Sequence, residues 1–504
     1  MRDIRVLFLY PNSRKMSLVP PSIALLSQLL KDRGFKVDLF DTSYYAIEGF
    51  SGDSDKANLA DLVTRPFNLD EKIELKQNNV FEDLNRKVEE FGPDLIAVSA
   101  DESTFLLSIH LLKAIRHRGI LTILGGVFAT FAPERAIRYP EIDIICVGEG
   151  EQALVELCER LRHGENYLNV TNLWVKQKDG HIVRNSMATP INIDTNPLPD
   201  IGIFEESRHY RAMAGKIYRM MSVETHRGCP FTCAFCNTPA QNRLYRSETN
   251  RNYVRKKSMD KVHEELVYYR DIWKAEYIFF TADTFFTYSN HEIDEFCEMY
   301  SDIRIPFYCN AHPNTITEYK VKRLKEVGLH RLGVGIEHGN EKFRREVVNR
   351  HYSNQDVIKA LQIPKKYGVP FSANNIIGFP DETYELAMDT VELNRQVGAN
   401  DVSCSIFQPY YGTALRELAV KQGYLDPDAI APTNTDNSVL EMPSFSRERI
   451  RGLRRTFVMY VRFPKSRWNE IRVAEQLTPE GDAIWAKLRD EFVATFINTQ
   501  DSSK

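Results

Sequence analysis

The segment Arg227-Gly-Cys-Pro-Phe-Thr-Cys-Ala-Phe-Cys236 places three cysteines in one short stretch with the spacing C-x₃-C-x₂-C. A loop this short can present three thiolates to three corners of one four-iron cluster, since cysteine is the usual ligand of such clusters. Pro230 disfavours a helix that would separate the sulfurs. No local fourth Cys or His completes the set, so one iron would stay open to another ligand. We therefore predict a [4Fe–4S] site on Cys229, Cys233 and Cys236.

Other interpretations of these cysteines are weaker. A structural zinc site normally takes four ligands, often as two C-x₂-C pairs, and no second pair is present. A disulfide is disfavoured in the reducing cytoplasm. The other cysteines lie in predicted strands or helices, where a thiol acts as a small apolar side chain. These are Cys146, Cys158, Cys297, Cys309 and Cys404.

Composition narrows the class of protein. The 504 residues are enough for about two or three domains, and 43% hydrophobic with 27% charged residues indicates a globular chain. Lys and Arg number 65 against 69 Asp and Glu, a net charge of −4 that lacks the basic excess of a dedicated nucleic-acid binder. No apolar run approaches the roughly 18 residues of a membrane helix, and no signal-peptide layout is present. We expect a cytoplasmic protein without a membrane span.

The first third of the chain alternates apolar runs with amphipathic stretches, which predicts a doubly wound parallel sheet with right-handed crossovers. The expected strands are Val6–Tyr10, Val37–Asp41, Leu95–Ala100, Leu121–Leu124 and Ile142–Val147. The expected helices are Ser22–Arg33, Phe81–Phe91, Leu106–Arg118 and Gln152–Arg162. A polar insertion, Ser51–Asn79, has a form that the pattern does not decide.

The pattern changes after Gly164. Asn172–Lys176 and His181–Arg184 flank Lys-Asp-Gly, which predicts a hairpin, and Asn196-Pro-Leu-Pro-Asp200 indicates a linker. A second alternation then predicts a partial (β/α)6 barrel, with its chemistry at the C-terminal ends of the strands. Its expected strands are Met221–Thr225, Tyr277–Thr281, Phe307–Ala311, Arg331–Ile336, Phe371–Ile377 and Val402–Phe407. Its expected helices include Lys261–Trp273, Tyr319–Glu326 and Gln355–Tyr367.

The chain is thus an α/β protein in four parts. Residues 1–165 form the doubly wound sheet, 166–215 the hairpin and linker, 216–425 the partial barrel, and 426–504 a mostly helical C-terminal region. The last part contains the basic run Arg447–Arg455. Because apolar residues are interspersed through this run, we favour a solvated helix face over a polyanion site.

Residues from Met220 to Leu425 resemble the radical S-adenosylmethionine (SAM) superfamily, which carries C-x₃-C-x₂-C with an aromatic residue before the last cysteine. The resemblance implies that the open iron binds SAM and that the reduced cluster cleaves it to a 5′-deoxyadenosyl radical. It implies that Glu337, in Gly335-Ile-Glu-His-Gly339, accepts a hydrogen bond from the SAM ribose, and that Ile376–Thr383 packs against adenine. Thr281-Ala-Asp-Thr-Phe285 replaces the usual Gly-Gly-Glu. The implied SAM-binding residues are Phe235, Asp283, Glu337, Ile376 and Gly378.

The first region resembles the Rossmann-like cobalamin-binding domain of cobalamin-dependent radical SAM enzymes. Gly125-Gly-Val-Phe-Ala-Thr130 and Gly148-Glu-Gly-Glu151 are similar to two loops of that domain, and glycine lets a large flat ligand approach the backbone. Taken singly, each could be an ordinary strand-to-helix turn. The loop Tyr10–Met16 contains no His, so no protein imidazole is expected below the cobalt. The implied cobalamin-binding residues are Ser22, Ser99, Gly125, Gly126, Phe128, Thr130, Gly148, Glu149, Gly150 and Glu151.

The resemblance implies an enzyme that uses a [4Fe–4S] cluster, SAM and cobalamin, and in such relatives the commonest task is methylation of an unactivated carbon by way of methylcobalamin. The C-terminal region would be a helical cap over the barrel. We also expect a small-molecule or natural-product substrate, an external electron donor such as flavodoxin or ferredoxin, and no nucleic-acid partner. An alternative is radical cyclisation or rearrangement without net methyl transfer. A non-catalytic cobalamin carrier or sensor is a further alternative, although it would leave the three cysteines unexplained.

Overall fold

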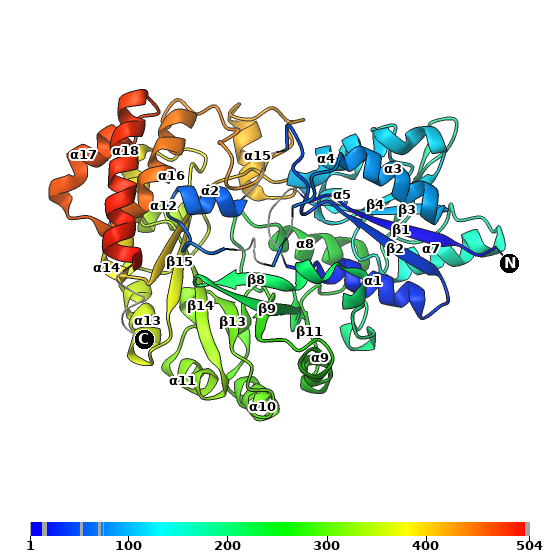
Figure 1. The fold of residues 1–504 in the computed structure, drawn as a ribbon, viewed down its shortest axis with the longest axis horizontal. Helices are drawn as coiled ribbons and strands as arrows, with labels where there is room; N and C mark the ends of the chain where they lie inside the picture. The colour runs from blue at the N-terminus through cyan, green and yellow to red at the C-terminus, as the bar shows by residue number, and fades with distance from the viewer. Residues whose placement is uncertain (1, 13–17, 51–53, 69–71, 74, 499–504) are drawn as a thin grey trace.

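The computed structural model describes residues 2–12, 18–50, 54–68, 72–73 and 75–498. Figure 1 shows an N-terminal α/β domain in blue and cyan, a curled sheet with helices in green and yellow, and C-terminal helices in orange and red. The α/β fold predicted from the sequence is confirmed, and each expected strand named above is present to within a few residues.

The first sheet has the strand order β2-β1-β3-β4-β5-β6-β7, with the first five strands parallel. Alternate residues of β1 pack into two different cores, because helices cover both faces. Val6 and Phe8 pack with α1 and α7, whereas Leu7 and Leu9 pack with α3 and α4. The strands are β1 (Arg5–Tyr10), β2 (Lys36–Asp41), β3 (Leu95–Ser99), β4 (Leu121–Gly125), β5 (Ile144–Cys146), β6 (Leu173–Lys176) and β7 (Ile182–Arg184). The helices are α1 (Pro21–Lys31), α3 (Val80–Phe91), α4 (Glu102–Ile115), α5 (Val127–Phe131), α6 (Pro133–Ala136) and α7 (Glu151–His163).

The predicted hairpin, β6 and β7, extends this first sheet as two antiparallel strands instead of standing apart with the linker. The linker then leads to the second sheet, whose order is β16-β15-β14-β13-β12-β9-β8. Six of its strands are parallel and β8 is an antiparallel edge, which confirms the partial barrel. The strands are β8 (Tyr210–Met213), β9 (Lys216–Val223), β12 (Tyr277–Phe280), β13 (Phe307–Ala311), β14 (Leu329–Glu337), β15 (Phe371–Ile377) and β16 (Asp401–Ile406).

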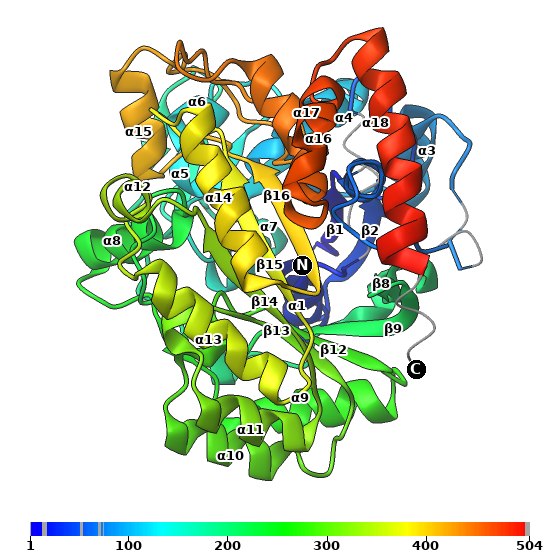
Figure 2. The ribbon, with the colours of Figure 1, turned by 90° about the vertical axis from the view of Figure 1, so that its left-hand side faces the viewer.

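Helices α10, α11, α13 and α14 cover the outer face of this sheet, as Figure 2 shows. A small ribbon of two strands, β10 (His226–Arg227) and β11 (Arg255–Lys256), stands beyond β9. The helices of this part are α8 (Asn237–Thr249), α9 (Met259–Asp271), α10 (Asn290–Tyr300), α11 (Glu318–Val327), α12 (Glu341–Glu346), α13 (Asn354–Lys366), α14 (Tyr384–Val397) and α15 (Ala414–Lys421).

The C-terminal part contains α16 (Arg447–Arg462), α17 (Trp468–Ala474) and α18 (Pro479–Phe492). The expectation of a solvated basic face on α16 is wrong, because Arg454 and Arg455 are buried. Arg455 donates to Asp482 (2.7 Å) and to two backbone carbonyls, so partners from elsewhere in the chain compensate its burial.

The polar insertion supplies the partners of the other buried arginine. It contains α2 (Ser54–Ala60), which lies beside α16 and apart from the rest of the first domain (Figure 1). Asp61 is nearly buried and pairs with Arg454 and with Arg451 (2.8 Å), and Arg454 also donates to Asn58 (2.9 Å). Residues 51–53, 69–71 and 74 of the insertion lie outside the described residues. Among the helices that the structure describes, none has the length and apolar character needed to span a bilayer.

The change Asp61→Ala is expected to destabilise the protein by about 3–5 kcal/mol, because it leaves buried arginine charge without its carboxylate partner. Thermal unfolding followed by circular dichroism measures the effect. The change Asp3→Ala is a matched control, since it removes an ion pair with Lys36 in which both side chains are more than half exposed. Equal unfolding temperatures for the two variants would contradict the role of Asp61.

Candidate functional site

The cysteine segment is a loop between β10 and α8, and two other parts of the chain hold it in place. The Ala234 N–H donates to the Val348 carbonyl (3.0 Å), and the Asn349 amide donates to the Thr232 carbonyl (2.7 Å). From the region after β16, the Leu415 N–H donates to the Ala234 carbonyl (3.1 Å). These bonds fix a segment that has no regular secondary structure of its own.

The three thiols differ in their surroundings. Cys233 is buried, whereas Cys229 and Cys236 are half-buried. Burial raises the pKa of Cys229 to about 11 in the protein without iron, so binding of iron would have to displace its proton. In the described part of the chain, no three His, Cys, Asp or Glu side chains cluster as ligands of a single metal ion. A [4Fe–4S] cluster instead takes one thiolate at each of three separate irons, and a loop with three free thiols fits that requirement.

Arg350 connects the cysteine loop to Glu337. Its guanidinium donates to Cys233 Sγ (3.1 Å) and to the Gly335 carbonyl, and it lies 3.4 Å from a Glu337 carboxylate oxygen. Burial raises the pKa of Glu337 and the charge of Arg350 opposes that rise. Glu337 ends β14 with a left-handed backbone (φ 66°), a conformation that non-glycine residues rarely adopt. Such strain is frequent at functional sites.

Of the other residues implied for SAM, Phe235 lies in the cysteine loop, whereas Asp283, Ile376 and Gly378 lie near the carboxyl ends of β12 and β15. Phe235 lies against Arg350, with the guanidinium 5.7 Å from its ring centre. Asp283 accepts a hydrogen bond from Thr238 (3.1 Å), and desolvation raises its pKa. The Gly378 and Phe379 N–H groups both donate to Glu382, which bonds His338 (3.0 Å) in a fully buried pair. Ile376 precedes this turn and is half-buried. Arg350 was not predicted, since an isolated charged residue carries no spacing signal. His338 and Glu382 lie within motifs quoted from the sequence but had no role assigned.

A cavity of about 620 Å³ lies at the carboxyl ends of the strands of the first sheet. This is the edge at which doubly wound sheets bind ligands. It is lined by nine of the ten residues implied for cobalamin, namely Ser22, Ser99, Gly125, Gly126, Thr130, Gly148, Glu149, Gly150 and Glu151. Phe128 is absent from the lining, because its side chain is buried between Phe105 (ring centres 4.4 Å apart) and Tyr411 (5.6 Å). Of the histidine-free loop Tyr10–Met16, residues 13–16 lie outside the described residues.

The glycines of this cavity are of two kinds. A Cβ on Gly126 would lie 2.4 Å from the Ala100 carbonyl oxygen, and its φ of 107° is accessible mainly to glycine. The fold itself therefore requires this glycine. Gly125 differs, because its φ is ordinary and a Cβ there would meet no atom closer than 4.0 Å. A side chain at Gly125 is compatible with the fold but would take up space at the cavity.

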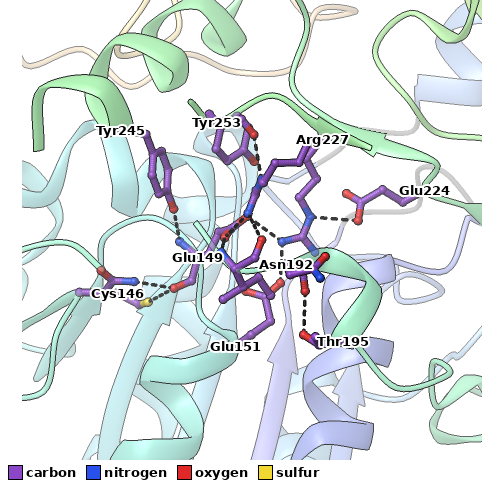
Figure 3. Close-up of polar contacts among 12 residues, drawn as sticks. Cys146, Glu149, Glu151, Asn192, Thr195, Glu224, Arg227, Tyr245 and Tyr253 are labelled. Atoms are coloured by element: carbon purple, nitrogen blue, oxygen red, sulfur yellow. Dashed lines mark hydrogen bonds and ion pairs between the residues drawn. The ribbon is translucent and has the colours of Figure 1, made fainter. Parts of the chain in front are cut away.

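Residues of the second domain also line the cavity, among them Glu224 and Arg227. Arg227 stands two residues before Cys229 and donates to Glu149 (2.8 Å) and Glu151 (2.6 Å) of the first domain, as Figure 3 shows. The sequence pattern did not indicate this arginine as a site residue, since Glu149 and Glu151 lie more than 70 residues away in the chain. The cavity and the cysteine loop are therefore adjacent.

Comparisons with known proteins agree with this arrangement. Residues 59–158 match the model of the B12 binding domain, and residues 223–393 match that of the radical SAM superfamily. An uncharacterized methyltransferase of Pyrococcus horikoshii is 28% identical over 399 residues, which cover 78% of this chain and 83% of that protein. An anaerobic magnesium-protoporphyrin IX monomethyl ester cyclase of Rubrivivax gelatinosus is 26% identical over 70% of this chain and 64% of its own length.

A solved structure extends the likeness of fold to nearly the whole chain. The cobalamin-dependent SAM radical enzyme OxsB, with aqua-cobalamin and SAM bound, superposes with a TM-score of 0.64 at 16% identity, covering 97% of this chain and 71% of that one. The radical SAM family implies a [4Fe–4S] cluster and SAM, and the B12 binding domain implies cobalamin. With both domains in one chain, three thiols on the loop after the first barrel strand, and a cavity between the domains, this protein belongs to the cobalamin-dependent radical SAM enzymes.

Proposed function

We propose that this enzyme transfers a methyl group to an unactivated carbon of a small-molecule substrate. The observation that carries the proposal is the shared cavity, which residues of the first domain such as Ser99 and Gly125 line together with Arg227 from beside the cysteine loop. The methyltransferase name of the Pyrococcus relative supports the type of transfer. When bound, the cluster and SAM supply radical chemistry and cobalamin supplies a methyl carrier.

The chain's own residues would bind the cluster and SAM, orient them and shield them from water. Cys229, Cys233 and Cys236 would bind the cluster, and Glu337 would accept a hydrogen bond from the SAM ribose. Arg350 favours the ionised form of Glu337 and holds it in line with the cysteine loop, through the contacts described above. Correct orientation of this kind can account for several kcal/mol of an enzyme's barrier lowering, about 7–11 in favourable cases.

The glycines and polar side chains of the cavity would receive the corrin and its nucleotide tail. Thr130 holds this edge together, because its hydroxyl donates to the Gly126 carbonyl (3.0 Å) and accepts from the Gly148 N–H (3.1 Å). Phe128 is buried and its ring packs against that of Tyr411, which joins the first domain to the region after β16. An external flavodoxin or ferredoxin would deliver the electrons.

Radical cyclisation without net methyl transfer is a second candidate, favoured by the 26% identity to the magnesium-protoporphyrin ester cyclase. The two functions differ in one countable property of the product. A methyltransferase adds one methyl carbon from SAM, whereas a cyclase adds none.

Anaerobically reconstituted protein, given SAM with a deuterated methyl group, is expected to yield a product that carries the labelled methyl, detected by mass spectrometry. Candidate substrates can be chosen from the products of neighbouring genes. A variant with all three of Cys229, Cys233 and Cys236 replaced by Ala should hold no four-iron cluster and form no product. A product without label would favour the cyclase, and a cluster retained in the triple variant would contradict the ligand assignment.

The change Gly125→Val is expected to weaken cobalamin retention by about 1–3 kcal/mol, because the added methyl groups crowd a site that the fold leaves open. Cobalamin is measured from the visible spectrum after gel filtration, and the unfolding temperature and iron content should stay at wild-type values. Gly126→Ala is the comparison, since its Cβ would collide with Ala100 and lower stability even without cobalamin. If Gly125→Val retained cobalamin fully, the corrin would have to bind at another place.

The change Glu337→Gln is expected to weaken SAM binding by about 1–3 kcal/mol, because the charged acceptor is lost while the shape is kept. Calorimetric titration of SAM into reconstituted protein measures it. Glu346→Gln is a suitable control, as this carboxylate lies on the exposed side of α12 and pairs only with Arg345 among the contacts described. Equal affinities in the two variants would assign the ribose contact to another residue.

A further inference from the structure

Five charged side chains join the first domain to the barrel at one place, and Figure 3 labels four of them, Glu149, Glu151, Glu224 and Arg227. Glu149 and Glu151 come from the loop that follows β5, and Glu224, Arg227 and Arg255 come from the barrel. Arg227 donates to Glu149 (2.8 Å), Glu151 (2.6 Å) and Glu224 (3.0 Å), so one guanidinium bonds three carboxylates. Arg255 bonds both oxygens of Glu149. We call these five residues the junction cluster.

The junction cluster is largely removed from water. The side chains of Glu149 and Glu151 are 9% exposed and that of Arg227 is 13% exposed. Burial disfavours the charged form of Glu149, but the hydrogen bond from Arg255 and the charge of Arg227 outweigh it and lower its pKa. In such surroundings an arginine holds carboxylates in a fixed geometry, because its planar donors face them directly.

The position of Arg227 in the chain links the junction cluster to the cysteine loop. Arg227 lies two residues before Cys229, and β10 pairs it with Arg255 across the two-stranded ribbon. On the other side of the cysteine loop, α8 carries Tyr245, whose hydroxyl accepts from the Glu149 N–H (2.8 Å). Asn242, also on α8, donates to the Cys229 carbonyl (2.9 Å). The segments that flank the cysteines therefore both contact the Gly148–Glu151 loop.

We propose that Arg227 is a positioning residue that fixes the cobalamin-binding loop Gly148–Glu151 relative to the cysteine loop and so sets the spacing of the two cofactors. This inference rests on the proposed function, since it needs both cofactors to act in one reaction. A displacement of about 1 Å can lower a rate about a hundredfold, which gives the spacing a direct chemical importance.

Glu102 provides a matched control, because it also joins the first domain to a distant part of the chain. Its carboxylate accepts from the Tyr411 N–H (2.8 Å) and the Ala431 N–H (2.7 Å) and lies 3.7 Å from Arg416. Among the contacts that the structure describes, Glu102 makes none with the Gly148–Glu151 loop or with the cysteine loop. A change at Glu102 therefore reports general loosening between the parts of the chain.

The first experiment uses the protein without cofactors and measures hydrogen–deuterium exchange of peptides covering residues 148–151 and 228–236. The variants are Arg227→Lys, the charge-balanced double variant Arg227→Gln with Glu151→Gln, and Glu102→Gln. In both Arg227 variants, the backbone amides of each of the two loops should exchange about tenfold faster than in the wild type, which corresponds to about 1.4 kcal/mol. In Glu102→Gln, the exchange rates of both loops should stay unchanged. Faster exchange in one loop only, or the same effect from Glu102→Gln, would contradict the proposal that Arg227 fixes the two loops relative to each other.

The second experiment uses reconstituted protein and measures iron, cobalamin and the magnetic interaction between the reduced cluster and Co(II) in cobalamin. The Arg227→Lys variant should bind both cofactors at wild-type amounts but show a shifted or broadened interspin distance, which Glu102→Gln does not. An unchanged distance, or loss of only one cofactor, would overturn the role of Arg227. Wild-type protein that bound no cobalamin would instead contradict the proposed function, so the two failures are distinguishable.

Discussion

The burial of charge where the first domain meets the barrel is the constraint on which the site depends. Two carboxylates of one domain lie in a place nearly closed to water, and arginines of the other domain pair with them. Separating the domains would leave those groups unpaired unless water reached them, which makes partial separation unfavourable. The two domains therefore stay together around the cavity because of this electrostatic requirement as well as through apolar packing.

A second constraint acts within the barrel. The cysteine loop is irregular, so its shape comes from neighbours: the segment after α12, the region after β16, and Arg350. The side chain of Arg350 is 10% exposed, and the atoms it contacts include those of a thiol, a carboxylate, a backbone carbonyl and the Tyr352 hydroxyl. One side chain thus connects the cysteine loop to the strand end that carries Glu337.

Much of the fold could be predicted because parallel strands covered on both faces form continuous apolar runs, as in Val6–Leu9 and Leu95–Val98. The cysteines could be predicted because their spacing is dense. Arg227 and Arg350 could not, since each acts through partners distant in sequence. The basic run of α16 was misread for the same reason, because Asp61 lies 390 residues before Arg451. Phe128 matched a loop pattern, yet its aromatic neighbours place it in the core.

The pairing of the insertion with α16 has a consequence for synthesis of the chain. A ribosome adds about 5–20 residues per second, so α16 emerges about 20–80 s after Asp61, given the 390 residues between Asp61 and Arg451. During that interval α2 and Asp61 have no arginine partner, although the strands and helices of the first sheet are already available to pack. The N-terminal domain therefore folds early as a unit with its insertion undocked, and the arrival of the C-terminal helices completes it.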